Sequence, residues 1–103
     1  MIITEGENVY STEVEEVLYR HPKISECVVI GLPDKEWGER VVACIIAKAG
    51  STIDKKELYQ YLKTRLSAFK IPKEFLIMDD FPRSPAGKVL KRNLRRNFLK
   101  GGQ

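Results

Sequence analysis

Apolar residues recur at helical spacing in three separate segments of the chain. In chain order these residues are Val14, Val17 and Leu18, then Leu58, Tyr61, Leu62 and Leu66, and finally Leu90, Leu94 and Phe98. Residues three or four positions apart lie on the same side of a helix, so each set forms one apolar stripe. The pattern predicts three amphipathic helices, the first of which runs from about Ser11 to Arg20.

Polar residues at the start of two of these predicted helices are suited to capping. Thr12 and Glu15 have the spacing of a capping box, in which each side chain bonds a backbone N–H of the first turn. Asp54 and Glu57 offer a similar cap to the second helix. The third helix is expected to begin at Lys88.

Three other segments are rich in β-branched and large apolar residues. They cover residues 26–30, 41–47 and 75–77 and predict three short strands, the first of them ended by a turn at residues 31–34. Residues 2–10 are apolar at both ends and polar in the middle, which indicates a short N-terminal hairpin. Three strands and three helices predict the α+β class, as a small two-layer domain whose helices cover one face of the sheet.

Length and composition fit a single soluble domain that spans residues 1–103. With 103 residues, 43% of them hydrophobic and 31% charged, the chain has room for one core and not for two domains. No segment approaches the roughly 20 apolar residues of a membrane span, and the first residues lack a secretory signal. The sequence therefore predicts a cytoplasmic protein that is too short to be a complete synthetase or kinase. Residues 99–103 are expected to form a disordered tail.

The cysteines and the histidine are expected to have structural roles. Cys27 and Cys44 lie within apolar runs, which favours buried free thiols over metal ligands or a disulfide. His21 precedes Pro22 at a predicted helix end, where an imidazolium can bond carbonyl groups. With two cysteines and one histidine, the sequence offers neither a zinc cluster nor a nucleophilic triad, and no metal ligand is predicted.

Positive charge is concentrated at the end of the chain. Residues 1–80 carry 11 basic and 14 acidic side chains, whereas residues 81–103 carry seven basic and no acidic ones. Such a basic block favours an anionic partner, which is a nucleic acid, a membrane surface, a phosphate ligand or an acidic protein face.

The segment at residues 81–92 carries the clearest candidate for chemistry. Lys88 lies at the predicted start of the third helix, where the helix dipole already creates a positive end. A lysine there is favourable when phosphate or carboxylate occupies the site, whereas the alternative is a solvated lysine after a turn glycine. Pro82 and Val89 exclude a nucleotide-binding P-loop, which needs a glycine and a hydroxyl at these two positions.

Four segments, in this order and at matching spacing, give the chain a resemblance to a known family. They are residues 2–10, 33–39, 69–73 and 82–88. Over essentially its whole length the chain resembles the small C-terminal domain of adenylate-forming enzymes, which include acyl-CoA synthetases, nonribosomal peptide adenylation domains and firefly luciferase. Among these, it is most similar to the AMP-forming acyl-CoA synthetases.

The resemblance implies the mobile C-terminal lid of a two-step ligase, whose large N-terminal domain binds most of the ATP and Mg. Such an enzyme makes an acyl-adenylate and pyrophosphate from a carboxylic acid and ATP, and then transfers the acyl group to CoA with release of AMP. Between the steps the lid rotates and presents another face to the N-terminal domain. Lys88 matches the family's adenylation lysine, whose ammonium would stabilise the charge between the carboxylate and the α-phosphate. Without its N-terminal domain the chain is expected to fold and to be inactive.

By the same resemblance, two segments are expected to contribute to the CoA site. Their residues are Gly6, Glu7, Asn8, Phe69, Lys70 and Lys73. Gly6 would let the backbone approach the ligand closely, and the alternative is an ordinary hairpin turn. Phe69 would stack on adenine while the two lysines meet phosphates, and the alternative is a core phenylalanine between solvated lysines.

The sequence departs from the family pattern beside this first segment. Glu5 stands in place of the first glycine of Gly-Gly-Glu-Asn, and Ser11 stands in place of a common proline. Glu5 adds bulk and negative charge near a polyanionic ligand, which opposes CoA binding. Trp37 and Glu39 are expected to be structural, the first packed on the sheet and the second paired with a base.

Two other functions fit the basic C-terminal segment. One is a module that binds nucleic acid or a membrane surface through Arg92, Arg95, Arg96 and Lys100, although no exposed aromatic side chains alternate with these cations. The other is a free-standing interaction domain that docks on a separate adenylating subunit. The resemblance favours the ligase, whose partners are its own N-terminal adenylation domain, an acyl-adenylate and CoA, without nucleic acid and without stable membrane insertion. It also favours a fatty or other hydrophobic acid as the substrate.

Overall fold

The computed structural model describes residues 1–4, 6–36 and 38–101 of the chain. In chain order its elements are β1 (Ile2–Thr4), β2 (Glu7–Val9), α1 (Ser11–Tyr19), β3 (Ile24–Asp34), β4 (Gly38–Ala47), α2 (Lys55–Lys63), the 3-10 turn η1 (Ala68–Lys70), β5 (Glu74–Ile77) and α3 (Lys91–Gly101). These elements confirm the α+β class and the three amphipathic helices that the sequence predicts.

β4 is the central strand of the sheet. It pairs antiparallel with β3 over nearly the full length of both strands. On its other side, β5 runs parallel to the segment from Val42 to Ile45, and β1 meets Gly38 through Thr4. β2 pairs with β1, so the predicted N-terminal hairpin is confirmed and belongs to the same sheet. In the described part of the chain the sheet therefore has five strands, where the sequence predicts three and a separate hairpin.

The first long strand does not end at the predicted turn. β3 continues through residues 31–34 and ends at Asp34, opposite Gly38 of β4. Pro33 is tolerated because β3 ends the pairing order of the sheet, where a missing N–H costs no ladder bond. Gly31 serves packing and not a turn, since a Cβ at this position would lie 3.0 Å from side-chain atoms of Ile2.

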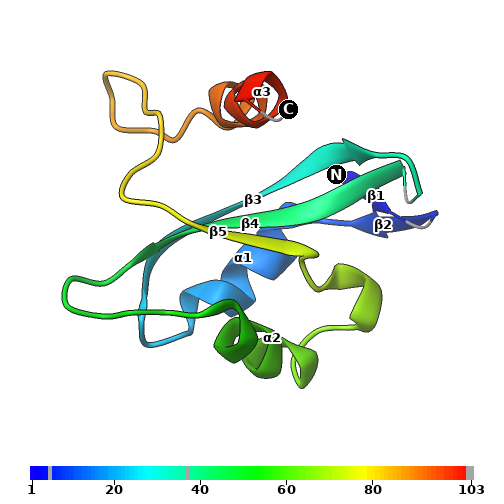
Figure 1. The fold of residues 1–103 in the computed structure, drawn as a ribbon, viewed down its shortest axis with the longest axis horizontal. Coiled ribbons are helices and arrows are strands. Elements are labelled where there is room, and N and C mark those ends of the chain that lie inside the picture. The colour runs from blue at the N-terminus through cyan, green and yellow to red at the C-terminus, as the bar shows by residue number, and fades with distance from the viewer. Residues whose placement is uncertain (5, 37, 102–103) are drawn as a thin grey trace.

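The helices cover both faces of the sheet, which corrects the predicted two-layer arrangement. α1 and α2 lie on one face, where Leu18 and Leu62 enter the larger core together with Val41 of β4. α3 lies on the opposite face (Figure 1), where Leu94 and Val42 enter a second core. The domain therefore has three layers, because the uninterrupted apolar run of β4 presents alternate side chains to the two faces.

The first two helices begin in different ways. Asp54 caps α2 as predicted, since its carboxylate accepts the N–H of Glu57 at 2.7 Å. The capping box predicted for α1 is wrong, because the helix follows Tyr10, which makes no side-chain capping bond. Glu15 turns to β3 instead, where its carboxylate accepts the N–H of Val29 at 2.8 Å.

The last helix replaces part of the predicted tail. Residues 99–101 continue α3, whereas Gly102 and Gln103 lie outside the described residues. Throughout the described ranges, each helix is too short or too polar to cross a membrane.

Candidate functional site

Lys88 lies at the tip of a hairpin-like loop between β5 and α3. Arg83 and Val89 form an isolated antiparallel bridge across this loop. Within it, the N–H of Ser84 donates to the carbonyl of Lys88 and the N–H of Gly87 donates to the carbonyl of Ser84, both at 2.8 Å. Gly87 has a φ of +85°, which glycine adopts without strain. The bonds fix the backbone around Lys88, while Lys88 itself is exposed.

Lys88 precedes the third helix, which corrects the predicted position at its start. α3 begins three residues later, at Lys91. The intervening backbone is held in the loop, because the N–H of Leu90 donates to the carbonyl of Pro82 at 2.8 Å. The carbonyl of Leu90 then accepts the N–H of Leu94 at 3.1 Å, which begins the helical bonding. Lys88 therefore owes its place to the loop and not to a helix terminus.

Arg83 fastens the loop to the sheet. Its guanidinium lies 2.7 Å from Oε2 of Glu26, on β3, and 3.0 Å from Oδ1 of Asp80. A third bond, at 3.3 Å, reaches the carbonyl of Gly87. The hydrogen bonds to Glu26 and Asp80 raise the pKa of the Arg83 guanidinium above its ordinary value. Two hydrogen bonds lower the pKa of the Asp80 carboxyl. The larger effect comes from the backbone N–H of Phe81 and the smaller from the Arg83 side chain.

Sequence analysis does not identify Arg83 as a site residue. Its partner Asp80 is three positions away, so the turn-rich segment contains a signal for that pair. Glu26 is 57 positions away and meets Arg83 only when β3 and the loop come together in the fold.

The ammonium of Lys88 makes no hydrogen bond or ion pair with another described residue. Lys70 and Lys91, by contrast, lie 2.9 and 3.1 Å from the carboxylates of Glu13 and Glu15. An unpaired ammonium on a fixed loop retains its charge for an anion that approaches from outside the domain.

The second group of predicted site residues lies toward the opposite end of the sheet from this loop (Figure 1). Gly6 forms the β1–β2 turn with a φ of +76°, and a Cβ there would meet no atom within 4 Å. Glu7 and Asn8 follow in β2 and are exposed. β2 contacts η1, which carries Phe69 and Lys70. The fold thus places the two segments side by side and separates both from the loop before α3.

The contacts around η1 are partly structural. Phe69 packs against the larger core, and Nζ of Lys70 lies 5.7 Å from the centre of its ring. The ion pair with Glu13 already compensates the charge of Lys70 within the domain. Lys73 is exposed just before β5, and its backbone N–H donates to the carbonyl of Val41 at 2.8 Å. Phe69 therefore contributes to packing in addition to any contact with a ligand.

The cysteines are buried free thiols, as predicted, whereas the predicted capping of helix carbonyls by the His21 ring is wrong. Cys27 and Cys44 are free and buried, and desolvation raises the pKa of each thiol to about 12. His21 is also buried, and its Nδ1 accepts the N–H of Lys23 at 3.1 Å. Its backbone N–H, and not its ring, donates to the helix carbonyl of Leu18, at 3.0 Å.

The expected roles of Glu39, Glu5 and Trp37 differ in whether the structure bears on them. Glu39 accepts the N–H of Ile3 at 2.9 Å, where the sequence predicts a pair with a base. Glu5 and Trp37 lie outside the described residues, so their expected roles stay predictions. No group of three or more His, Cys, Asp or Glu side chains in the described ranges could hold a metal ion.

Comparison with curated proteins places the chain in one family. Residues 13–88 match the model of the AMP-binding enzyme C-terminal domain. The chain is 46% identical over 98 residues to a feruloyl-CoA synthase of Amycolatopsis and 42% identical over 98 residues to a long-chain-fatty-acid–CoA ligase of Mycobacterium tuberculosis. It is 43% identical over 97 residues to a fatty acid–[acyl-carrier-protein] ligase of Streptomyces coeruleorubidus. These matches cover 94–95% of this chain and 19–20% of each relative.

Solved structures show the same likeness in three dimensions. ATP-bound MatB from Rhodopseudomonas palustris matches with a TM-score of 0.90 and 38% identity, over 93% of this chain and 19% of that one. A fatty acyl-CoA synthetase of M. tuberculosis matches with a TM-score of 0.88 and 41% identity, over 97% and 20% of the two chains. The chain spans about one fifth of the proteins that it matches. It belongs to the family of AMP-binding enzyme C-terminal domains.

Proposed function

We propose that the chain is the mobile C-terminal domain of an AMP-forming acyl-CoA synthetase, and that Lys88 serves the first of its two half-reactions. The observation that carries this proposal is the exposed Lys88 ammonium, which no described residue neutralises, on a backbone held by the Arg83–Val89 bridge. Family membership and the names of two CoA-ligase relatives support the reaction class. The N-terminal domain of such an enzyme would supply the sites for ATP and Mg.

The first half-reaction brings two anions together. A carboxylate oxygen of the acid attacks the α-phosphate of ATP, and the bond to pyrophosphate breaks as the acyl-adenylate forms. An ammonium between the carboxylate and the α-phosphate oxygens stabilises this transition state in a site closed to water. The fixed loop reduces the freedom that the Lys88 side chain would lose on entering such a site.

The second half-reaction belongs to the other end of the sheet. There the thiol of CoA attacks the acyl carbonyl, a thioester forms and AMP leaves. The open space around Gly6 supports a close approach of the pantetheine arm to the hairpin backbone, with η1 beside it. The domain measures 37 × 33 × 23 Å, and its two candidate sites lie toward opposite ends of the sheet (Figure 1). This separation supports a rotation of the domain between the half-reactions.

The substrate acid is proposed to be a fatty or other hydrophobic acid, and the acceptor to be CoA. The relatives named for feruloyl and long-chain fatty acids support this class without selecting one compound. The relative named as an acyl-carrier-protein ligase makes a carrier-protein thiol the second candidate acceptor. Supplying the acyl-adenylate with CoA in one reaction and with a phosphopantetheinylated carrier protein in another distinguishes the two acceptors.

Replacing Lys88 in the full enzyme tests the proposal. In Lys88→Ala we expect acyl-adenylate formation to slow by about 100-fold or more, because a transition-state charge loses its partner. Thioester formation from supplied acyl-adenylate and CoA should change by less than about threefold. The two rates are measured separately, as release of pyrophosphate and as formation of thioester.

Lys63→Ala, which removes an exposed lysine at the end of α2, is the matched control and should leave both rates unchanged. A wild-type rate of acyl-adenylate formation in Lys88→Ala would contradict the proposal. It would favour instead a basic interaction module that docks on another molecule through its C-terminal cations.

A further inference from the structure

Three arginines form an unpaired cationic surface on α3. Arg92, Arg95 and Arg96 are exposed, and none of them makes a hydrogen bond or ion pair with another described residue. The other four arginines of the chain each bond a described residue, and these are Arg20, Arg40, Arg65 and Arg83. We call the three unpaired arginines, together with Leu99, the basic face of α3.

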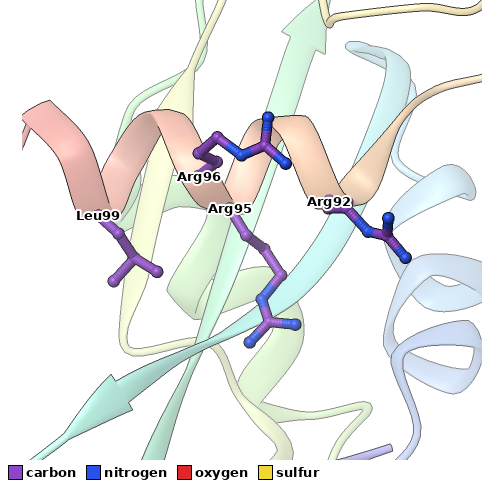
Figure 2. A pocket seen from close by; sticks show the side chains of 4 residues that line it. All are labelled: Arg92, Arg95, Arg96 and Leu99. Carbon is purple, nitrogen blue, oxygen red and sulfur yellow. The ribbon is translucent and has the colours of Figure 1, made fainter.

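Leu99 gives this basic face an apolar edge. It is 56% exposed and, with the three arginines, lines an open hollow of about 550 Å³ (Figure 2). Arginine stems and an exposed leucine bury apolar area well against a protein surface, and arginine is enriched in protein interfaces. Binding of a single-stranded nucleic acid is typically strengthened by aromatic side chains that stack on bases, whereas Phe98 packs against the second core.

The basic face lies close to the two places where an adenylation domain would meet this chain. α3 begins three residues after Lys88, which that domain receives under the proposed function. A second hollow, of about 330 Å³, joins Arg92 and Arg95 to Met1, before which the adenylation domain would be connected. α3 and the loop before it lie on the same side of the sheet (Figure 1), so an adenylation domain that receives Lys88 would approach this side.

The positive charge of the basic face restricts the kind of protein surface that can pack against it. The sequence has no acidic side chain after Asp80, so the segment itself offers no counter-charge to the three arginines. Contact with a neutral or basic surface would desolvate these guanidinium groups without pairing them, which is unfavourable. An acidic surface pairs them and also orients the approaching domain through long-range attraction.

We propose that the basic face of α3 docks on an acidic surface of the adenylation domain while Lys88 is in its site. The inference rests on the proposed function and adds to it a contact that is specific for the first half-reaction. Rotation of the domain for the second half-reaction carries α3 away from this surface, so the arginines act on the first step alone.

The test uses the full enzyme and two triple variants of matched charge. The first is Arg92→Gln, Arg95→Gln and Arg96→Gln, which removes the charge of the basic face. The control is Lys35→Gln, Lys48→Gln and Lys63→Gln, which removes three exposed cations from other parts of the domain. Both half-reactions are measured at about 0.05 M and about 0.5 M salt, where screening differs strongly.

The basic-face variant should lower kcat/KM of acyl-adenylate formation by about 10- to 100-fold at low salt, and the difference from wild type should shrink at high salt. Thioester formation from supplied acyl-adenylate should stay within about twofold of wild type. The control variant should match wild type in both steps. Arg→Lys at the same three positions keeps the charge and should recover most of the rate.

Four results would overturn the proposal, three of them in the rate of acyl-adenylate formation or its response to salt. These three are an unchanged rate of acyl-adenylate formation, an equal loss in both half-reactions, and a loss that salt does not reduce. A defect confined to transfer onto a carrier-protein thiol would also overturn it, and would assign the basic face to an acidic carrier protein. Lys88→Ala, measured in parallel, separates failure of the proposed function from failure of the docking surface. If Lys88→Ala leaves acyl-adenylate formation unchanged, the proposed function fails. If Lys88→Ala slows this step and the basic-face variant does not, only the docking surface fails.

Discussion

Arg83 joins three groups that are separated along the chain. It binds the carboxylate of Glu26 on β3, the carboxylate of Asp80 and the carbonyl of Gly87. The ammonium of Lys88 makes no bond with another described residue, so its position depends on a loop that Arg83 holds against the sheet. Under the proposed function, Arg83 would therefore be a positioning residue that acts through Lys88.

Replacing Arg83 should separate positioning from stability. In the full enzyme, Arg83→Leu is expected to slow acyl-adenylate formation by about tenfold, because the loop loses its bonds to β3, and to affect thioester formation much less. Arg83→Lys retains the charge and should restore part of the rate. Both half-reactions and the melting temperature are measured for each variant.

Arg20→Leu is the control, because Arg20 forms an exposed ion pair with Glu16 on α1, far along the chain from the loop. Equal slowing of both half-reactions in Arg83→Leu, with a lowered melting temperature, would show that Arg83 serves stability alone.

The two buried thiols make the stability of the domain fall at high pH. Cys27 and Cys44 have a folded-state pKa of about 12, above the ordinary value of 9.0, because burial disfavours the thiolate. Stability from the protonated thiols is therefore complete below about pH 9 and declines as the pH rises toward 12. Replacing both cysteines by alanine should reduce the loss of unfolding free energy between these pH values, as measured by denaturant titration. Equal losses in the variant and in wild type would contradict this assignment.

At the scale of elements, Glu15 connects α1, β3 and α3. Its carboxylate accepts the N–H of Val29 at 2.8 Å and lies 3.1 Å from Nζ of Lys91, the first residue of α3. The side chain is only 17% exposed, so its bond to β3 is largely shielded from water. One carboxylate of α1 thereby satisfies a backbone N–H of the edge strand β3 and holds the first residue of α3.

Removing this carboxylate should destabilise the domain measurably. Glu15→Ala is expected to lower the free energy of unfolding by about 1–3 kcal/mol, because the N–H of Val29 loses its acceptor. Glu15→Gln keeps an acceptor and should cost less. Glu16→Ala, which truncates a side chain that is 75% exposed, should stay within about 0.5 kcal/mol of wild type. Chemical denaturation monitored by circular dichroism gives the three values, and equal effects of Glu15→Ala and Glu16→Ala would refute the role of Glu15.

Glu15 also shows that a local sequence pattern does not always predict the contact that a side chain makes in the fold. Periodicity identifies all three helices because apolar burial decides them, and Asp54 caps α2 because that bond is local. The Thr12–Glu15 pattern has the same local form, but a distant N–H on β3 competes for Glu15 and wins. The turn predicted at residues 31–34 fails for a similar reason, since pairing with β4 holds that segment extended.

At the scale of the whole molecule, the candidate residues divide between two ends of one sheet. The motif around Lys88 predicts its proposed role, but the lack of a partner for its ammonium among the described residues follows from contacts that only the fold reveals. The resemblance assigns the β1–β2 hairpin and the turn η1 to one site, and in the fold β2 contacts η1. Arg83 and the basic face of α3 can be identified only from the fold, because their contacts, or the lack of them among described residues, involve segments far apart in the sequence.

The central strand places a limit on how such a domain can diversify. Val41, Val42, Ala43, Cys44 and Ile45 are all fully buried, so every change along this stretch of β4 must satisfy one of two cores. Substitutions that alter recognition can accumulate instead on loop tips and on the outer surface of α3, which lie outside both cores. New partners and acceptors can thus evolve at the periphery while the strand that holds the two ends of the sheet together stays the same.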